Sequence, residues 1–193
     1  MALAVVAVVI AYLVGTFPTA VMVGNRIGRD PTAEGSGNPG ASNIYRIGGR
    51  RAGVIVGLID VAKGALPTLA ALMGSGRPLA HAVWAAAVAG HVWPVTRRLR
   101  GGKGVATAGG GGLVLSPPIG LLCGALFLVV VRVGRIPALG SLSIALGYPL
   151  LVLVWGRPVW EVGASAGVAA ILVIRHQTNI RRILTRQESR VGR

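Results

Sequence analysis

The segment 53–73 reads GVIVGLIDVAKGALPTLAALM and is long and apolar enough to cross a lipid bilayer as one helix. Two charged side chains, Asp60 and Lys63, interrupt it three residues apart, which places them on one face of that helix. Six further apolar segments lie at about 2–24, 79–95, 105–116, 119–134, 138–156 and 158–174. The pattern predicts an all-α membrane protein of seven short transmembrane helices.

The composition agrees with a membrane environment. Of 193 residues, 53% are hydrophobic and 13% are charged, whereas a soluble domain carries about 25% charged residues. The segment 2–24 could be a signal peptide, but no basic residue precedes Asn25, so we expect a retained helix. Because nothing marks a separate soluble part, residues 1–193 are expected to form a single integral membrane domain.

The basic residues predict the orientation of the helices. The net charge is +15, and the Lys and Arg residues lie in short loops, as the positive-inside bias requires; a nucleic-acid partner is not expected. With the N-terminus outside and the C-terminus inside, all but three of the 20 Lys and Arg residues, Arg193 included, lie on the inner side. The exceptions are Arg77 and Arg157 outside and Lys63 within a span.

Segments 105–116 and 119–134 could instead form one kinked helix, because a glycine run and Pro117-Pro118 weaken the boundary. That merger would move Arg132, Arg135 or the C-terminal arginines to the outer side, so we prefer seven spans.

The first polar loop, residues 34–46, reads EGSGNPGASNIYR. Its glycines allow the backbone to approach a ligand closely, and Arg46 supplies a planar fork that suits phosphate. If a helix begins after Gly40, Asn43 and Arg46 share one face. The neutral hydrogen-bonding candidates are Ser36, Asn38 and Asn43. An ordinary turn rich in Gly and Asn is the alternative.

The second polar loop, residues 90–107, contains GHVWP and then RGGKGVAT. Glycines beside Lys103 at the start of an apolar helix suit an anion, because free N–H groups and the positive helix end face the ligand. The spacing is not that of a Walker A loop. A basic loop that only orients the helices would explain Arg97 and Arg98 but not the glycines. The candidate ligands are Gly101, Gly102, Lys103, Gly104 and Thr107.

The third polar segment, residues 175–182, reads RHQTNIRR and places His176 and Asn179 on one helical face. Ser141 lies near the inner end of another apolar segment, where a hydroxyl is also common as a helix contact.

The intramembrane pair Asp60 and Lys63 has two interpretations. An ionisable residue inside a membrane is a functional candidate by default, but a mutual ion pair that only packs helices is equally plausible.

Several kinds of chemistry lack their residues in this sequence. It has no H-E-x-x-H motif, no cysteine cluster and no paired carboxylates in the loops, so we expect no metal and no cofactor. The single cysteine, Cys123, can form no intrachain disulfide.

Five short motifs resemble those of one family. SGNPGASN at 36–43 resembles the SGNxGATN motif of the bacterial acyl-phosphate:glycerol-3-phosphate acyltransferases (PlsY). Its other signatures are similar, in the same order, to DVAKG at 60–64, GHVWP at 90–94, GGKGVAT at 101–107 and HQTNI at 176–180. The sequence departs from the family pattern at Ser42 (usually Thr), Arg100 (commonly Lys) and Ala138, where the first serine of Ser-Leu-x-Ser is lost and Ser141 is kept.

The resemblance implies transfer of a fatty acyl group from acyl phosphate to the 1-hydroxyl of glycerol 3-phosphate. The products are lysophosphatidic acid and phosphate, in an early step of phospholipid synthesis. It also implies seven helices in the bacterial plasma membrane, with the site on the cytoplasmic side. A mixed-anhydride donor needs no protein nucleophile, so catalysis would rest on positioning and charge stabilisation.

The implied catalytic residues are Arg46, Lys103, His176 and Asn179. Lys103 and Arg46 would bind phosphate, and His176 would hydrogen-bond glycerol 3-phosphate or act as base, unless a substrate phosphate oxygen takes the proton. Substrate binding would fall to Ser36, Asn38, Asn43, Gly101, Gly102, Gly104, Thr107 and Ser141. No obligatory protein partner is expected, and the surrounding partner is membrane lipid.

A small transporter of an anionic metabolite is the alternative, since glycine-rich helices and an intramembrane charge pair fit one. The two halves, however, show no inverted repeat, and every polar segment is expected on one side. A non-enzymatic scaffold would leave the three polar segments unexplained.

Overall fold

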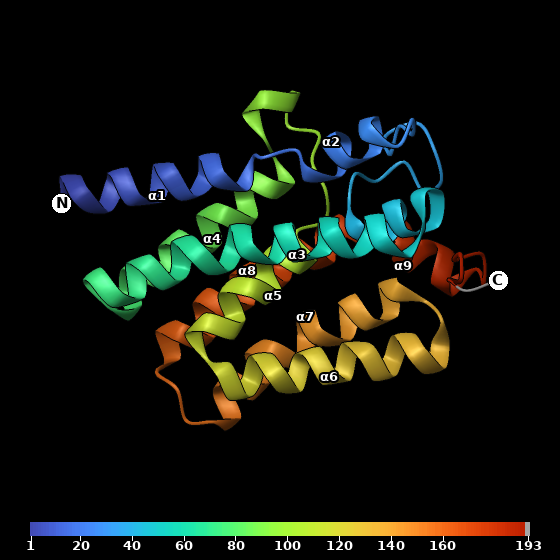
Figure 1. The fold of residues 1–193 in the computed structure, drawn as a ribbon. Helices are drawn as coiled ribbons and strands as arrows, with labels where there is room; N and C mark the ends of the chain where they lie inside the picture. The colour runs from blue at the N-terminus through green and yellow to red at the C-terminus, as the bar shows by residue number, and fades with distance from the viewer. Residues whose placement is uncertain (192–193) are drawn as a thin grey trace. The chain divides into compact units, whose positions relative to one another are not determined.

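The computed structural model describes residues 1–191, and within that range every regular element is a helix (Figure 1). The first part of the chain forms α1 (Ala2–Gly15), α2 (Thr19–Arg26), α3 (Ala41–Ser75), α4 (Arg77–Val92), a 3-10 turn (Val95–Arg97) and α5 (Val105–Leu115). The rest forms α6 (Pro117–Gly134), α7 (Pro137–Val154), α8 (Val159–Arg175) and α9 (Gln177–Leu184). Arg193 of the predicted inner tail lies outside the described residues.

Each of the seven predicted apolar segments contains a helix. The segments 105–116 and 119–134 form two helices, α5 and α6, which are separated at Ser116. A proline in the first turn of α6 starts the new helix, because its missing N–H would be unsatisfied there anyway.

Helix length and composition identify the elements able to cross a bilayer. Four qualify in the described part of the chain: Ala2–Arg26, α3, α6 and α7. A fifth is obtained if α8 and α9, which meet at a bend of 61°, count as one broken span. Leucines on the outer faces of α3, α6 and α7, such as Leu58, Leu121 and Leu150, are exposed, as expected of helices that face lipid.

The chain divides into two compact units, Met1–Leu115 and the residues from Ser116 onward. In the first unit α1 packs against α4 through facing glycines. A Cβ at Gly15 would overlap the carbonyl of Ala87, and a Cβ at Gly90 would overlap the carbonyl of Tyr12. Small residues at a crossing let two membrane helices approach closely.

Helix α3 packs against both α4 and α5. Its contact with α5 also relies on glycine, because a Cβ at Gly64 would overlap the carbonyl of Thr107. The helix is interrupted at Gly49 (φ 84°, ψ 175°), so the apolar part that carries Asp60 and Lys63 is a separate helical segment. This packing places the two charged side chains opposite the end of α4.

In the second unit α6, α7 and α8 pack in sequence around a core of Ile119, Cys123 and Val152. Cys123 is buried and unpaired with another cysteine. The unit ends in α9.

Candidate active site

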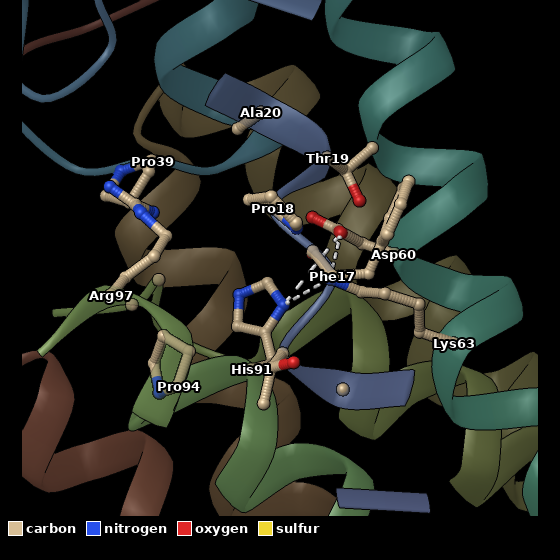
Figure 2. A pocket seen from close by; sticks show the side chains of 14 residues that line it. Phe17, Pro18, Thr19, Ala20, Pro39, Asp60, Lys63, His91, Pro94 and Arg97 are labelled. Atoms are coloured by element: carbon tan, nitrogen blue, oxygen red, sulfur yellow. Dashed lines mark hydrogen bonds and ion pairs between the residues drawn. The ribbon is translucent and has the colours of Figure 1, made fainter. Parts of the chain in front are cut away.

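The first unit contains a cluster of buried polar side chains centred on Lys63 (Figure 2). The Lys63 ammonium lies 2.8 Å from Asp60 Oδ1, donates to the carbonyl of Phe17 at 2.9 Å, and lies 3.2 Å from Nδ1 of His91. A lysine has three hydrogens to donate, and these three acceptors come from three different helices or helix junctions. The pair predicted from sequence is therefore part of a larger network.

This geometry determines the form of His91. An ammonium can only donate, so the facing Nδ1 atom accepts, and the hydrogen of the neutral ring is on Nε2. Thr107 Oγ1 lies 3.2 Å from the same Nδ1 atom. Asp60 Oδ1 is farther from it, at 3.9 Å. His91 thus joins α3, α4 and α5 at one point.

A small cavity lies beside the cluster. Its volume is about 20 Å³, roughly the space of one water molecule. Thr19 lines it from the start of α2, and its hydroxyl is directed toward Asp60 (Figure 2). Within residues 1–191 the Thr19 hydroxyl is buried and has no hydrogen-bond partner.

The glycine loop (residues 101–104) packs against the end of α4. The N–H of Gly101 donates to the carbonyl of Val92 at 3.2 Å, and that of Gly102 donates to the carbonyl of His91 at 3.1 Å. The expectation of free N–H groups facing an anion is therefore wrong for these two residues, since both groups are used within the protein. For the first turn of α5, which begins at Val105, the expectation that N–H groups face an anion stays a prediction.

Lys103 is half-buried at the start of α5, as the sequence predicted. Gly104, which follows it, has φ of 80°, a conformation that glycine adopts without strain. The carbonyl of Gly104 accepts from Ala108 and so opens the helix. Lys103 is thereby held beside the positive end of α5.

The first polar loop is held by Asn43. Its side-chain amide donates to the carbonyls of Pro31 and Glu34, both at 2.9 Å, and its Oδ1 accepts from the N–H of Ser36 at 2.8 Å. The residue is 1% exposed, and these bonds use both of its donors. Substrate binding by Asn43 stays a prediction, but the structure assigns it a supporting role that the sequence analysis missed.

The other candidate residues of the first polar loop are less buried than Asn43. Helix α3 begins at Ala41, as expected for a helix start after Gly40. Ser36, Asn38 and Arg46 are half-buried, which leaves each of them partly accessible.

In the second unit His176 ends α8 and precedes α9. It is 2% exposed, and its Nδ1 lies 2.7 Å from the carbonyl of Leu172. A carbonyl only accepts, so Nδ1 carries the hydrogen, and Nε2 is the ring atom that can take up a proton.

The other candidates of this unit have local partners. Asn179 donates to Glu188 at 2.8 Å, and the Ser141 hydroxyl donates to the carbonyl of Pro137 at 3.0 Å. Glu188 was not identified from sequence, because it lies beyond the motif in a segment without a recognisable pattern.

The structure thus brings together some of the residues predicted from sequence. In the first unit Asp60, Lys63 and Thr107 share the cluster with His91, which also contacts the glycine loop. His91 was noted only as part of a motif, and no role was predicted for it. In the second unit His176 and Asn179 lie close together at the junction of α8 and α9.

Known proteins are similar to this chain along nearly its whole length. Residues 5–186 match the family model described as glycerol-3-phosphate acyltransferase. Two curated proteins of that name are similar. The one from Methylococcus capsulatus is 40% identical, with 94% of this chain and 93% of the relative covered. The one from Rubrobacter xylanophilus is 38% identical, with 98% and 96% covered.

A solved structure has the same fold. It is described as the crystal structure of PlsY, an integral membrane glycerol 3-phosphate acyltransferase, in its glycerol 3-phosphate form. The TM-score is 0.94 at 34% identity, and 98% of this chain and 96% of that chain are covered. A second structure of PlsY, in its lysophosphatidic acid form, has a TM-score of 0.90 at 32% identity.

Proposed function

The chain belongs to the glycerol-3-phosphate acyltransferase family, whose membrane enzymes acylate glycerol 3-phosphate to lysophosphatidic acid, and we propose acyl phosphate as its donor and the 1-hydroxyl as the acceptor. The observation that carries the donor proposal is a half-buried lysine, Lys103, at the start of α5, next to a glycine loop. A full positive charge at a helix N-terminus suits a leaving phosphate.

In the proposed reaction the 1-hydroxyl oxygen attacks the acyl carbonyl carbon. An ester bond forms, the acyl–oxygen bond of the mixed anhydride breaks, and inorganic phosphate leaves. Lys103 and Arg46 stabilise the negative charge on phosphate groups, an effect that positioned cations exert strongly at a site shielded from water. Because the donor is already activated, the step needs no covalent enzyme intermediate.

The hydroxyl proton goes to Nε2 of His176 or to a phosphate oxygen. The hydrogen bond of Nδ1 to Leu172 supports His176 as base, because it keeps Nε2 as the accepting atom. If His176 is the base, wild-type kcat falls at acid pH, where an imidazole is protonated, and the His176→Ala variant loses that dependence. An unchanged pH profile with a raised KM for glycerol 3-phosphate would leave His176 with a binding role only.

The remaining binding roles follow the family motifs, residue by residue. The substrates are proposed to be oriented by Ser36, Asn38, Asn43, Gly101, Gly102, Gly104, Thr107, Ser141 and Asn179. For Asn43, Gly101 and Gly102 the hydrogen bonds described above make the contribution an indirect one, through the shape of the loops.

We also propose that the chain forms one domain of seven spans in the bacterial plasma membrane, with the N-terminus outside and the site on the cytoplasmic side. The family match supports one domain because it runs without interruption through both compact units. The distribution of arginine and lysine supports the orientation.

The donor is tested with purified protein in detergent or vesicles, given labelled glycerol 3-phosphate and either acyl phosphate or acyl-CoA. We expect lysophosphatidic acid and an equal amount of inorganic phosphate with acyl phosphate, and no turnover with acyl-CoA. Robust turnover with acyl-CoA, in a preparation free of enzymes that interconvert the donors, would refute the proposal.

The role of Lys103 is tested by Lys103→Ala. Loss of a charge-assisted hydrogen bond costs roughly 1.5–3 kcal/mol, which corresponds to about 10–150-fold in rate. Lys103→Arg should restore only part of the rate, because a planar fork does not replace a point charge. A folded Lys103→Ala protein with wild-type acyl transfer would remove Lys103 from the site.

A further inference from the structure

His91 lies between two features of the first unit, the ion pair of α3 and the glycine loop, yet the proposed chemistry gives it no role. It is buried in the last turn of α4, one residue before that helix ends. Its ring contacts the ion pair of α3 on one side, and its own carbonyl holds the glycine loop on the other.

On the side of the His91 ring that faces α3, charged groups fix its position. Lys63 is held in place by Asp60 Oδ1 at 2.8 Å and by the carbonyl of Phe17 at 2.9 Å, and it in turn fixes Nδ1 of His91. Buried charges of this kind tolerate little movement, because a displaced partner leaves an uncompensated charge. The ring of His91 is therefore held at one edge by a rigid anchor.

The opposite edge of the ring faces the glycine loop. A Cβ added to Gly102 would overlap His91 Nε2 and would lie 3.1 Å from the carbonyl oxygen of Pro39. In Figure 2 the second ring nitrogen points away from Lys63, toward the side where Pro39 lies. The backbone of Gly102 thus runs between the imidazole and the first polar loop, in a space that admits no side chain.

Gly101 differs from Gly102 in the kind of neighbour that crowds it. A Cβ there would also overlap a neighbour, but the neighbour is backbone, the carbonyl of His91, with the carbonyl of Val92 at 2.6 Å. Neither glycine has a positive φ. Both therefore require glycine for space alone, Gly102 because of the His91 ring and Gly101 because of the α4 backbone.

We propose that His91 is a positioning residue, which transmits the fixed position of the Asp60–Lys63 pair to the glycine loop and so places Lys103. The proposal rests on the proposed function, in which Lys103 binds phosphate one residue after Gly102. It gives a role to an ion pair that lies directly behind the loop carrying the proposed catalytic lysine.

The central experiment uses His91→Asn as the parent variant. The Asn side-chain oxygen replaces Nδ1 as acceptor for Lys63, so the buried ammonium keeps its three acceptors and the fold is retained. The part of the ring that faces Gly102 is lost. We expect kcat to fall about 10–100-fold, since displacement of a catalytic group by roughly 1 Å has an effect of that size, with a smaller change in the melting temperature than Lys63→Ala causes.

The diagnostic result is the effect of Gly102→Ala in two backgrounds. In the wild type the new methyl group overlaps the ring, and activity should drop at least as far as in His91→Asn. In His91→Asn the ring edge is gone, so the same change should cause a clearly smaller further loss of activity than it causes in the wild type. Gly101→Ala is the matched control: it overlaps backbone, so it should be equally damaging in both backgrounds.

A second measurement does not depend on catalysis. Hydrogen exchange read by mass spectrometry should show faster exchange of the peptide covering residues 99–106 in His91→Asn. The backbone carbonyls that accept from Gly101 and Gly102 remain in this variant, but the ring that packs against Gly102 no longer restrains the loop. Peptides from α1 and α3 should exchange as in the wild type. Faster exchange across the whole first unit would indicate a general structural role and would overturn the proposal.

The outcomes separate this proposal from the proposed function. A Gly102→Ala effect of the same size in both backgrounds, or an unchanged kcat in His91→Asn, would overturn the role of His91 even if acyl transfer is confirmed. If the wild type fails to use acyl phosphate, the donor proposal falls, while the exchange experiment still decides whether His91 positions the loop.

Discussion

At the scale of single residues, the structure shows what the two charged side chains of α3 contact. Both interpretations of Asp60 and Lys63 that the sequence left open treat them as a pair. The network is instead directional: besides its ion pair with Asp60, Lys63 donates to the carbonyl of Phe17 and faces Nδ1 of His91. The identity of each side chain at its position therefore matters, as well as the sum of the two charges.

This directionality predicts the outcome of a charge swap. In Asp60→Lys with Lys63→Asp, the carboxylate at 63 would face the carbonyl of Phe17 and Nδ1 of His91, two groups that cannot donate to it in their present form. We expect the double variant to be no more stable than either single variant, by thermal unfolding in detergent. Recovery of most of the lost stability would show that mutual attraction is the whole role of the pair.

Asn43 gives a second test at this scale. Asn43→Asp keeps the shape but replaces two donors by acceptors that face the carbonyls of Pro31 and Glu34. Each lost hydrogen bond contributes about 0.5–1.5 kcal/mol and a buried unpaired acceptor costs about 1–3 kcal/mol, so the loop should open.

Limited proteolysis between residues 30 and 42, together with kcat/KM, measures this effect. Asn25→Asp is the matched control, because that residue is exposed at the end of α2. Unchanged proteolysis with a raised KM would return Asn43 to the direct binding role predicted from sequence.

At the scale of elements, apolar length identified the helices but not their ends. The segment 2–24 is divided into α1 and α2 around Pro18, because proline cannot donate to a continuing helix. Helix α3 begins at Ala41, well before the apolar run that starts at residue 53. Its first turns are polar, and a break at Gly49 separates them from the apolar part. Hydrophobicity alone carries no signal for either feature.

The same limit applies to the site. Residue types that suit phosphate were recognised from sequence, and Lys103 does lie at a helix start. The partners of Asn43, Gly101 and Gly102 are backbone carbonyls, which every residue possesses. No residue type in the sequence marks such a partner, so these hydrogen bonds could be found only in the structure.

The contact of α3 with α5 yields a prediction for elements. Gly64→Ala would press a methyl group into the carbonyl of Thr107, and backbone cannot move aside cheaply. We expect a loss of about 1–3 kcal/mol in stability and lower activity, since Lys103 lies just before the first residue of α5. Gly57→Ala in the same helix is the control, because its Cβ would make only an ordinary 3.6 Å contact with Ala41. Equal melting temperatures for the two variants would contradict close packing at Gly64.

At the scale of the whole molecule, the apolar helices and the distribution of charge give complementary evidence on topology. Every predicted apolar segment contains a helix, while length and composition by themselves qualify four or five spans. The short helix α5 has 11 residues, below the roughly 20 that cross a bilayer upright. The proposed orientation therefore rests on charge, and the positive-inside bias favours it through the arginines proposed to lie inside, including Arg132 in the last turn of α6 and Arg135 just after it.

The topology is tested by cysteine labelling in a Cys123→Ala background, with new cysteines at exposed connections away from the motifs. Ser75→Cys, at the end of α3, and Val159→Cys, at the start of α8, should react with a membrane-impermeant reagent in intact cells. Thr96→Cys and Gln187→Cys should react only after the membrane is opened. Labelling of Gln187→Cys from outside would require an even number of spans. In that case the C-terminal arginines would lie on the outer face against the positive-inside bias, and the seven-span arrangement would have to be abandoned.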